Sequence, residues 1–300
     1  MKTNFPRWVV IVAALVSVTG DLSAQNKSVR RRGPTSKIYL AETKGDTQIV
    51  NNDRIYDARQ AAAFDAPGSV IETKADSHNV FVYSNGTGLY MEENTRISID
   101  RFDQEPFQAG RREIANEPVE PSMSQSQVLL VRGAVGICTS QMVAGSTMNY
   151  ATSHGMINIR HGRLAIDTTD EQTTIDLLNG DATVRGGDQD LGGQILRPGD
   201  RAVIRQGKAG QPRSVVVSQT PPMALQGLEN RVTLACNAKK TVSFDVIEKK
   251  SEQGLDAPAE GAAQESSAAT DQEIVARPTV PEKLPTNITV SADRLPGGTE

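Results

Sequence analysis

The chain has 300 residues and a formal net charge of −4, with only 4% aromatic residues and two cysteines. This mildly acidic balance argues against a nucleic-acid surface, and the scarcity of aromatic side chains means that a core must be built from Val, Ile, Leu and Ala. If the first 24 residues are removed as an export signal, about 275 residues remain, which is enough for one or two domains.

The first 24 residues have the three parts of a secretory signal peptide. Lys2 and Arg7 give a positive start, an apolar run covers 8–18, and the stretch 22–24 offers small residues to a signal peptidase. This apolar run is well short of the roughly twenty residues that a membrane-spanning helix needs. We therefore expect a cleaved signal, a mature protein that begins at Gln25, and no stable membrane span after cleavage. The expected location is the periplasm, the cell envelope or the medium.

After a basic linker over 25–39, the residues from 40 to 220 show a period of two rather than a helical period, which is typical of β-strands. The stretches 80–83, 96–100 and 214–217 are examples. Turn signals separate such runs, namely Asn85-Gly86, Asn179-Gly180, Gly186-Gly187, Gly192-Gly193 and Pro198-Gly199. This region is therefore predicted to be an all-β domain.

Three stretches of this domain share one template: apolar, x, apolar, x, x, Gly, x, apolar, x, apolar. Their glycines are Gly133, Gly162 and Gly180, and their apolar residues are Val128, Leu130, Val135, Ile137, Ile157, Ile159, Leu164, Ile166, Ile175, Leu177, Ala182 and Val184. The template predicts two strand segments with inward apolar side chains, joined by a glycine at a bend or at positive φ. The spacing is not regular, so we expect stacked β-layers, either solenoid-like or a sandwich.

Helical signals are few. The stretch 57–64 could form a short helix, and a second helix is expected after Pro221-Pro222, where Leu225, Leu228, Val232 and Ala235 recur at helical spacing. A strand over 241–246 would follow, so residues 221–250 are predicted to cap the β domain. The acidic, Pro- and Ala-rich tail over 251–300 cannot bury enough apolar surface to order itself and is expected to be disordered.

The order of several motifs resembles exported FecR-domain proteins of environmental bacteria. These motifs are Ser84-Asn85-Gly86-Thr87, the segment 93–107 that ends in Gln104-Glu105-Pro106-Phe107, the block 120–137, the stretch 152–162, the stretch 177–184 and Leu196-Arg197-Pro198-Gly199-Asp200. The likeness spans residues 40–205 and departs from the family pattern at Ser153 and His161. It implies a β-rich module that takes part in signal transduction through protein binding.

Regulatory FecR proteins carry a cytoplasmic anti-sigma segment and one membrane helix before this module. A signal peptide and a short linker precede it here, so we expect no direct contact between the mature chain and a sigma factor.

No pattern of catalytic residues stands out. The three histidines, His78, His154 and His161, lack the spacing of a metal site and are expected in surface turns. No catalytic elbow, zinc-protease motif or phosphate-binding loop occurs. The glycine–aspartate stretch 186–193 resembles a single calcium loop, and Asp167, Asp170, Glu171 and Asp176 are most simply a solvated loop and strand edge. We therefore expect no enzyme, no cofactor and no metal.

Two functions stay open at this point. The first is an exported, non-catalytic module for protein interaction or envelope sensing, with a protein partner in the cell envelope and no nucleic acid. The second is a carbohydrate-binding or cell-surface structural β-protein that uses the acidic loop at Asp170. Aromatic platforms for sugars are scarce, and the only clustered candidates, Phe81, Tyr83 and Tyr90, are better explained as strand packing.

Five glycines are the structural turn residues of this interpretation, namely Gly86, Gly133, Gly162, Gly180 and Gly199. Cys138 and Cys236 are chemically able to form a disulfide in an oxidising compartment, and each is equally suited to be a buried small residue.

Overall fold

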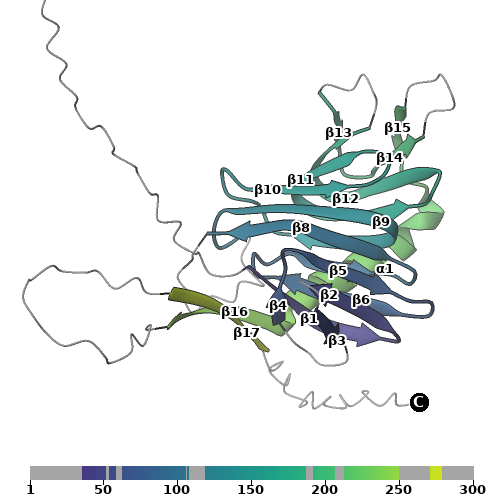
Figure 1. Ribbon diagram of the computed structural model, residues 1–300. Coiled ribbons are helices and arrows are strands. Elements are labelled where there is room, and N and C mark those ends of the chain that lie inside the picture. The colour runs from purple at the N-terminus through teal and green to yellow at the C-terminus, as the bar shows by residue number, and fades with distance from the viewer. Residues whose placement is uncertain are drawn as a thin grey trace, which may run out of the picture. The chain divides into compact units, whose positions relative to one another are not determined.

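The computed structural model describes residues 36–51, 54–58, 63–105, 107, 119–186, 192–206, 213–249 and 271–278. Strands β1 to β15 pair into one continuous 15-stranded sheet, and β16 (Val242–Lys249) pairs with β17 (Asp271–Pro278) in a second one (Figure 1). The fold is all-β with a single α-helix in the described residues, as predicted. The predicted signal peptide lies outside these residues.

The large sheet folds back on itself into two layers, because three long strands pass from one layer to the other. In order of pairing, the first layer contains β15 (Ser214–Gln219), β14 (Asp200–Arg205), the start of β12 (Gln172–Arg185), the ends of β11 (Met156–Thr168) and β9 (Ser124–Thr139), β7 (Gly88–Met91), β6 (His78–Tyr83), β1 (Lys37–Lys44) and β4 (Ala63–Asp65).

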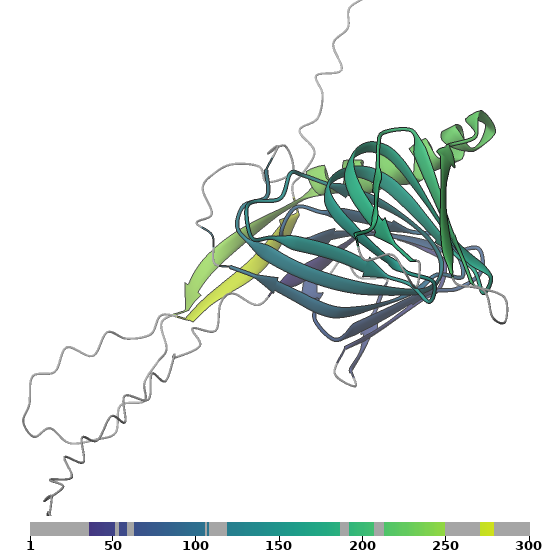
Figure 2. The same cartoon turned by 90° about the horizontal axis from the view of Figure 1, so that it is seen from above.

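The second layer begins at the other ends of the same long strands. It contains β13 (Gln194–Leu196), the end of β12, the start of β11, β10 (Thr147–Ala151), the start of β9, β8 (Arg96–Gln104), β5 (Ser69–Thr73), β2 (Thr47–Asn51) and β3 (Arg54–Asp57). Figure 2 shows the two layers on either side of the core.

The three copies of the glycine template are the three long strands. Each glycine has positive φ inside a strand that continues through it, and a β-carbon on Gly162 would overlap the carbonyl oxygen of Asn179 next to its cross-strand partner Gly180. All twelve apolar positions of the template lie in one core between the layers. Each larger aliphatic side chain there contributes roughly 1.5–3 kcal/mol, which exceeds the roughly 0.5–1 kcal/mol that a glycine costs in a strand.

Helix α1 (Pro222–Ala238) covers the outer face of the first layer. It starts after Pro221 with a proline in its first turn, where a missing N–H costs nothing. Leu228, Val232 and Ala235 then face the sheet, as their spacing predicts, and pack with the outward side chains of β6, β7 and β9. A 3₁₀ turn, η2 (Lys239–Thr241), connects the helix to β16. In Figure 2, α1 lies along the outside of the strands.

Three expectations about local structure need correction, and a fourth concerns the tail. The predicted helix over 57–64 is wrong at both ends, because Asp57 ends β3 and Ala63 begins β4, while 59–62 lie outside the described residues. Asn179-Gly180 is a bend inside β12 and does not end a strand. The β domain begins at Lys37, because Ile38 and Tyr39 are buried in β1.

The predicted disordered tail contains a strand. Residues 271–278 form β17, which pairs along its whole length with β16. This strand contains Ile274-Val275-Ala276, the longest uninterrupted apolar run of the predicted tail. The other residues of the predicted tail lie outside the described residues. Among those described, no helix is both long enough and apolar enough to cross a membrane.

Candidate interaction surface on the second layer

The outward face of the second layer carries two parallel rows of side chains that the strand register brings together. In the charged row, Gln48 of β2, Glu72 of β5, Arg96 of β8 and Arg132 of β9 are successive cross-strand partners. Next to it along the strands lies a second row, called the apolar row here, which contains Ile55, Val50 and Val70 and continues through Ser98 of β8 to Leu129. Adjacent rows on one face of a sheet lie about 7 Å apart.

Glu72 holds three cations at the centre of the charged row. Its carboxylate accepts hydrogen bonds from Lys74 Nζ at 2.6 Å, from Arg96 Nη1 at 2.9 Å and from Arg132 Nη2 at 3.0 Å. The hydrogen bond from Lys74, with the charges of Lys74 and Arg132 and the bond from Arg96, lowers the pKa of Glu72 against the opposing effect of its burial. The carboxylate is therefore charged at neutral pH, and three cations against one anion leave this cation cluster with a net charge of +2.

The three cations remain accessible although they are paired. The side chain of Glu72 is only 12% exposed, whereas those of Lys74, Arg96 and Arg132 are 43–53% exposed. Each arginine donates to Glu72 through a single terminal nitrogen, and a guanidinium carries five N–H donors. The carboxylate thus fixes the positions of the cations without occupying them.

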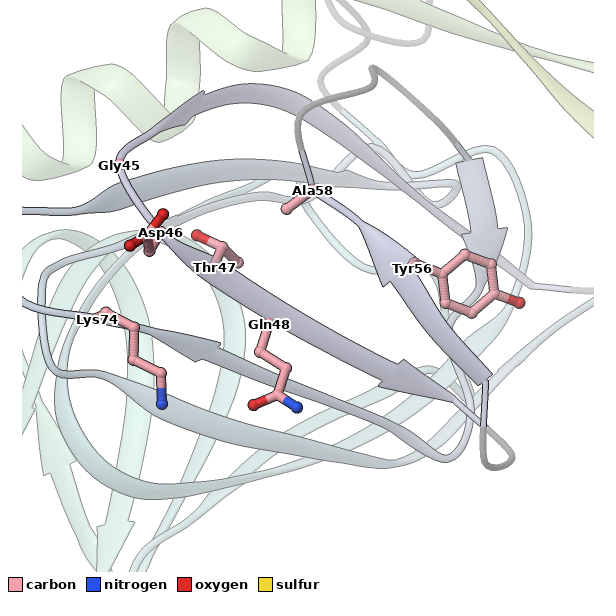
Figure 3. A pocket seen from close by; sticks show the side chains of 7 residues that line it. All are labelled: Gly45, Asp46, Thr47, Gln48, Tyr56, Ala58 and Lys74. Carbon is pink, nitrogen blue, oxygen red and sulfur yellow. The ribbon is translucent and has the colours of Figure 1, made fainter.

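Two hollows flank the cluster. The larger, of about 430 Å³, is lined by Gly45, Asp46, Thr47, Gln48, Tyr56, Ala58 and Lys74. In Figure 3 the Lys74 and Gln48 side chains extend in the same direction from neighbouring strands, with Asp46 above them. The smaller hollow, of about 200 Å³, is lined by Gln48, Val50, Val70, Glu72 and Arg96. Gln48 lines both hollows. In the smaller one, Val50 and Val70 of the apolar row lie next to Arg96 of the cation cluster.

The apolar row is partly exposed. Ile55 on edge strand β3 is 75% exposed, whereas Val50, Val70 and Leu129 are half-buried, and Val131, beside the row on β9, is 43% exposed. Helix α1 packs on the first layer, and no described element packs over these residues. An apolar stripe beside a row of cations is a feature of surfaces that bind other molecules.

The glycines and cysteines that the sequence singled out have structural positions. All five glycines, Gly86, Gly133, Gly162, Gly180 and Gly199, have positive φ. Only Gly86 and Gly199 lie in turns, and the others lie within long strands. Of the two states that the sequence left open for the cysteines, the structure has the disulfide, which joins Cys138 in β9 to Cys236 in α1.

The three histidines do not come together, and one of them is not on the surface. His154 is 1% exposed, with Nδ1 2.9 Å from Thr173 Oγ1 and Nε2 3.3 Å from the carbonyl oxygen of Asp170. The ring thus ties the turn before β11 to the turn before β12. His78 begins β6 beside Glu42 of β1, and His161 lies within β11, so neither is in the expected turn. No three metal-binding side chains converge anywhere in the described part of the chain.

The four carboxylates around Asp170 do not form one site. Asp176 is buried and accepts two hydrogen bonds from Arg201, at 2.7 and 2.9 Å, and this bonding raises the pKa of Arg201. Asp167 pairs with Arg231 of α1, whereas Asp170 and Glu171 are exposed in a turn. The predicted solvated edge is therefore correct for the turn and wrong for Asp176. The glycine–aspartate stretch 186–193 lies mostly outside the described residues.

The aromatic residues named for carbohydrate binding are not available to stack on a sugar. Phe81 and Tyr83 lie in the core between the layers, and Tyr90 is buried between the first layer and the elements that cover it. Burial raises the pKa of both tyrosines, and it does so more strongly for Tyr83. The interpretation of these residues as strand packing is therefore confirmed, and they offer no platform to the carbohydrate hypothesis.

The cation cluster was not predicted from the sequence. Glu72 and Lys74 are two residues apart, which places them on one face of a strand, and this signal is visible in the sequence. Arg96 and Arg132 join them only through pairing across β8 and β9, over separations of 24 and 60 residues from Glu72.

Comparison with known proteins adds little. No family model matches the chain, and no curated protein sequence matches it. Two crystal structures of a "putative anti-sigma factor" from Parabacteroides distasonis are similar, with TM-scores of 0.37 and 0.36 and identities of 10% and 9%. Each match covers 52% of this chain and 62% of the other. A likeness at this level assigns neither a family nor an activity.

Proposed function

We propose that the protein is an exported, non-catalytic binding module that acts in protein interaction or signalling in the cell envelope. The observation that carries the proposal is the cation cluster beside the partly exposed apolar row on the second layer. Its charge is fixed by Glu72, its cations are accessible, and its neighbours are carbon side chains. These are features of a surface that binds a partner.

The chemistry of the surface specifies the kind of partner. Carboxylates bind arginine and lysine by charge-assisted hydrogen bonds, and aliphatic side chains fit the apolar row. In an extended peptide, residues i and i+2 are about 7 Å apart on one side, which matches the distance between the two rows. We therefore propose that the surface binds an extended protein segment in which an Asp or Glu is followed two residues later by an apolar residue, so that both point to the same side.

The test is binding of synthetic 15-residue peptides that carry this pattern, with Lys-containing versions as the charge-reversed set. The test variant is Lys74→Gln with Arg132→Gln, which removes two cations and leaves Glu72 paired with Arg96. The matched control is Arg101→Gln with Arg160→Gln, which removes two exposed cations from β8 and β11, outside the cluster.

We expect the mature chain to bind acidic peptides at low salt, to lose at least tenfold in affinity in the cluster variant, and to keep its affinity in the control. Binding should weaken as salt rises, because exposed charges are screened. Equal binding of acidic and basic peptides, or unchanged binding by the cluster variant, would contradict the proposal.

Export is tested separately. When the full chain is expressed in a Gram-negative bacterium, we expect the protein in the periplasmic fraction or the medium, with an N-terminus at Gln25 by mass spectrometry. A protein that stays in the cytoplasm with residues 1–24 attached would contradict this part of the proposal.

A further inference from the structure

Strand β15 (Ser214–Gln219) leaves one long edge of the 15-stranded sheet open. It pairs with β14 on one side, and no described strand pairs with its other side (Figure 1). The other strands that end a layer are shorter or charged: β4 and β13 have three residues each, and β3 has four, with Arg54 and Asp57 among them. Short or charged edges are the usual protection against unwanted pairing.

β15 has none of these protections. Its six residues, Ser-Val-Val-Val-Ser-Gln, include no charged residue and no proline. Val216 points away from the core and is 53% exposed. Val217 faces the core side, opposite the fully buried Ala202, and is still 40% exposed. An inward apolar side chain with that exposure indicates that the core is open at this end of the first layer.

Residues 214–218 of β15, Ser-Val-Val-Val-Ser, also read the same in both directions about Val216. If a second copy of the strand pairs with it antiparallel, with the two-fold axis at Val216, each residue meets its own type. Val216 lies opposite Val216, Val215 opposite Val217, and Ser214 opposite Ser218. Just outside, Arg213 meets Gln219, so no two like charges face each other.

We propose that β15 pairs with β15 of a second copy of this chain, so that the first layers of two molecules form one continuous sheet. The interface is isologous, which closes the assembly at two copies. Val215 and Val217 of both copies then cover each other where the core is now open. This inference does not depend on the proposed function, because the cation cluster lies on the other layer.

The test is the mass of the mature chain by sedimentation equilibrium. Pairing of one strand is a small interface, so the concentration series has to reach the high micromolar range. We expect a monomer–dimer equilibrium that Val216→Lys abolishes, since it places two like charges directly opposite each other. An equimolar mixture of Val216→Lys and Val216→Glu should restore the dimer. The control, Ile195→Lys, alters an exposed residue of edge strand β13 and should leave the dimer intact.

A cysteine variant tests the register without depending on affinity. Because Cys138 and Cys236 are bonded to each other, Val216→Cys introduces a single free thiol, directly opposite its copy in the proposed pair. Mild oxidation should give a covalent dimer with Val216→Cys and none with Ile195→Cys. A wild-type monomer throughout the concentration series, a Val216→Lys variant that dimerises like the wild type, or equal crosslinking of the two cysteine variants would overturn the proposal.

Discussion

Gly88 of β7 packs directly against the backbone carbonyl of Ala235 in α1, with no space between them for a β-carbon. Gly136 of β9 contacts the backbone of Arg231 in the same way, one turn earlier in the helix. These two glycines let α1 lie closer to the first layer than side chains on β7 and β9 would allow. The close approach brings Cys236 within bonding distance of Cys138.

Replacing Gly88 with alanine should therefore displace the helix. The added methyl group would overlap main-chain atoms, which cannot rotate away, so we expect Gly88→Ala to lower the free energy of unfolding by about 1–3 kcal/mol. Urea denaturation followed by circular dichroism measures the change. The control is Gly227→Ala on the exposed side of α1, where a β-carbon meets no neighbour within 4 Å, and which should raise stability by about 0.5–1 kcal/mol. A Gly88→Ala protein as stable as the wild type would show that the helix is not held this closely.

The disulfide should contribute more to stability than this contact does. It links residues 98 positions apart, and a loop of that length restricts the unfolded chain strongly. We expect replacement of both cysteines by serine to lower the free energy of unfolding by about 2–5 kcal/mol. A reducing agent should destabilise the wild type to the same extent and leave the variant unchanged. If the reduced and oxidised wild-type proteins denature at the same urea concentration, the disulfide does not hold the helix on the sheet.

Much of this fold was predictable because its signals are local. The template around Gly133, Gly162 and Gly180 places apolar side chains on a fixed face of each strand, and that face is buried. Val80–Tyr83 is apolar throughout, and both of its faces are buried, one between the layers and one under α1. The helix after Pro222 was predictable for the same reason. The layered arrangement follows once strands bend at glycine while both halves keep an inward apolar side.

What could not be predicted depends on pairing between distant strands. Asp176 reads as one of several acidic residues in a loop, and only the register of β12 with β14 places Arg201 opposite it. The cation cluster likewise needs β5, β8 and β9 to be neighbours in the correct register. The helix wrongly predicted over 57–64 shows the converse error, because a local run of alanines there outweighed the pairing of β3 with β2 and of β4 with β1.

The buried pair of Asp176 and Arg201 should be structural. Asp176 also accepts a hydrogen bond from Thr220 Oγ1 at 2.9 Å, just before α1 begins, so its carboxylate joins β12, β14 and the start of the helix. Asp176→Asn would leave the Arg201 charge without its partner, and we expect a loss on the order of 3 kcal/mol in unfolding free energy.

The matched control for this pair is Asp170→Asn with Glu171→Gln in the exposed turn, which should change stability by less than about 0.5 kcal/mol. Denaturant titrations of the two variants at pH 7 compare them directly. The assignment fails if the turn variant loses as much stability as Asp176→Asn.

Lys239 gives the protein a predictable response to alkaline pH. It is 7% exposed at the end of α1, its ammonium donates to Ser140 Oγ at 2.9 Å, and burial lowers its pKa from 10.5 to about 8. Between pH 8 and 10.5 the unfolded chain binds a proton here that the folded chain does not. The contribution of Lys239 to the free energy of unfolding therefore rises with pH between pH 8 and 10.5. Below pH 8 the folded protein bears the full free-energy cost of burying the charged ammonium.

Replacing Lys239 with methionine removes this cost and keeps the aliphatic stem. We expect Lys239→Met to be more stable than the wild type at pH 7, by up to about 3 kcal/mol, and the difference to shrink toward pH 10.5. Tyr39 and Tyr90, whose pKa values burial raises, also titrate at alkaline pH, but they do so in both proteins and cancel in the difference.

Urea titrations between pH 7 and 10 measure the difference in unfolding free energy between Lys239→Met and the wild type. The control is Lys240→Met, which removes a positive charge from the exposed neighbouring residue. A stability difference that is constant over this range would mean that Lys239 stays charged in the folded protein.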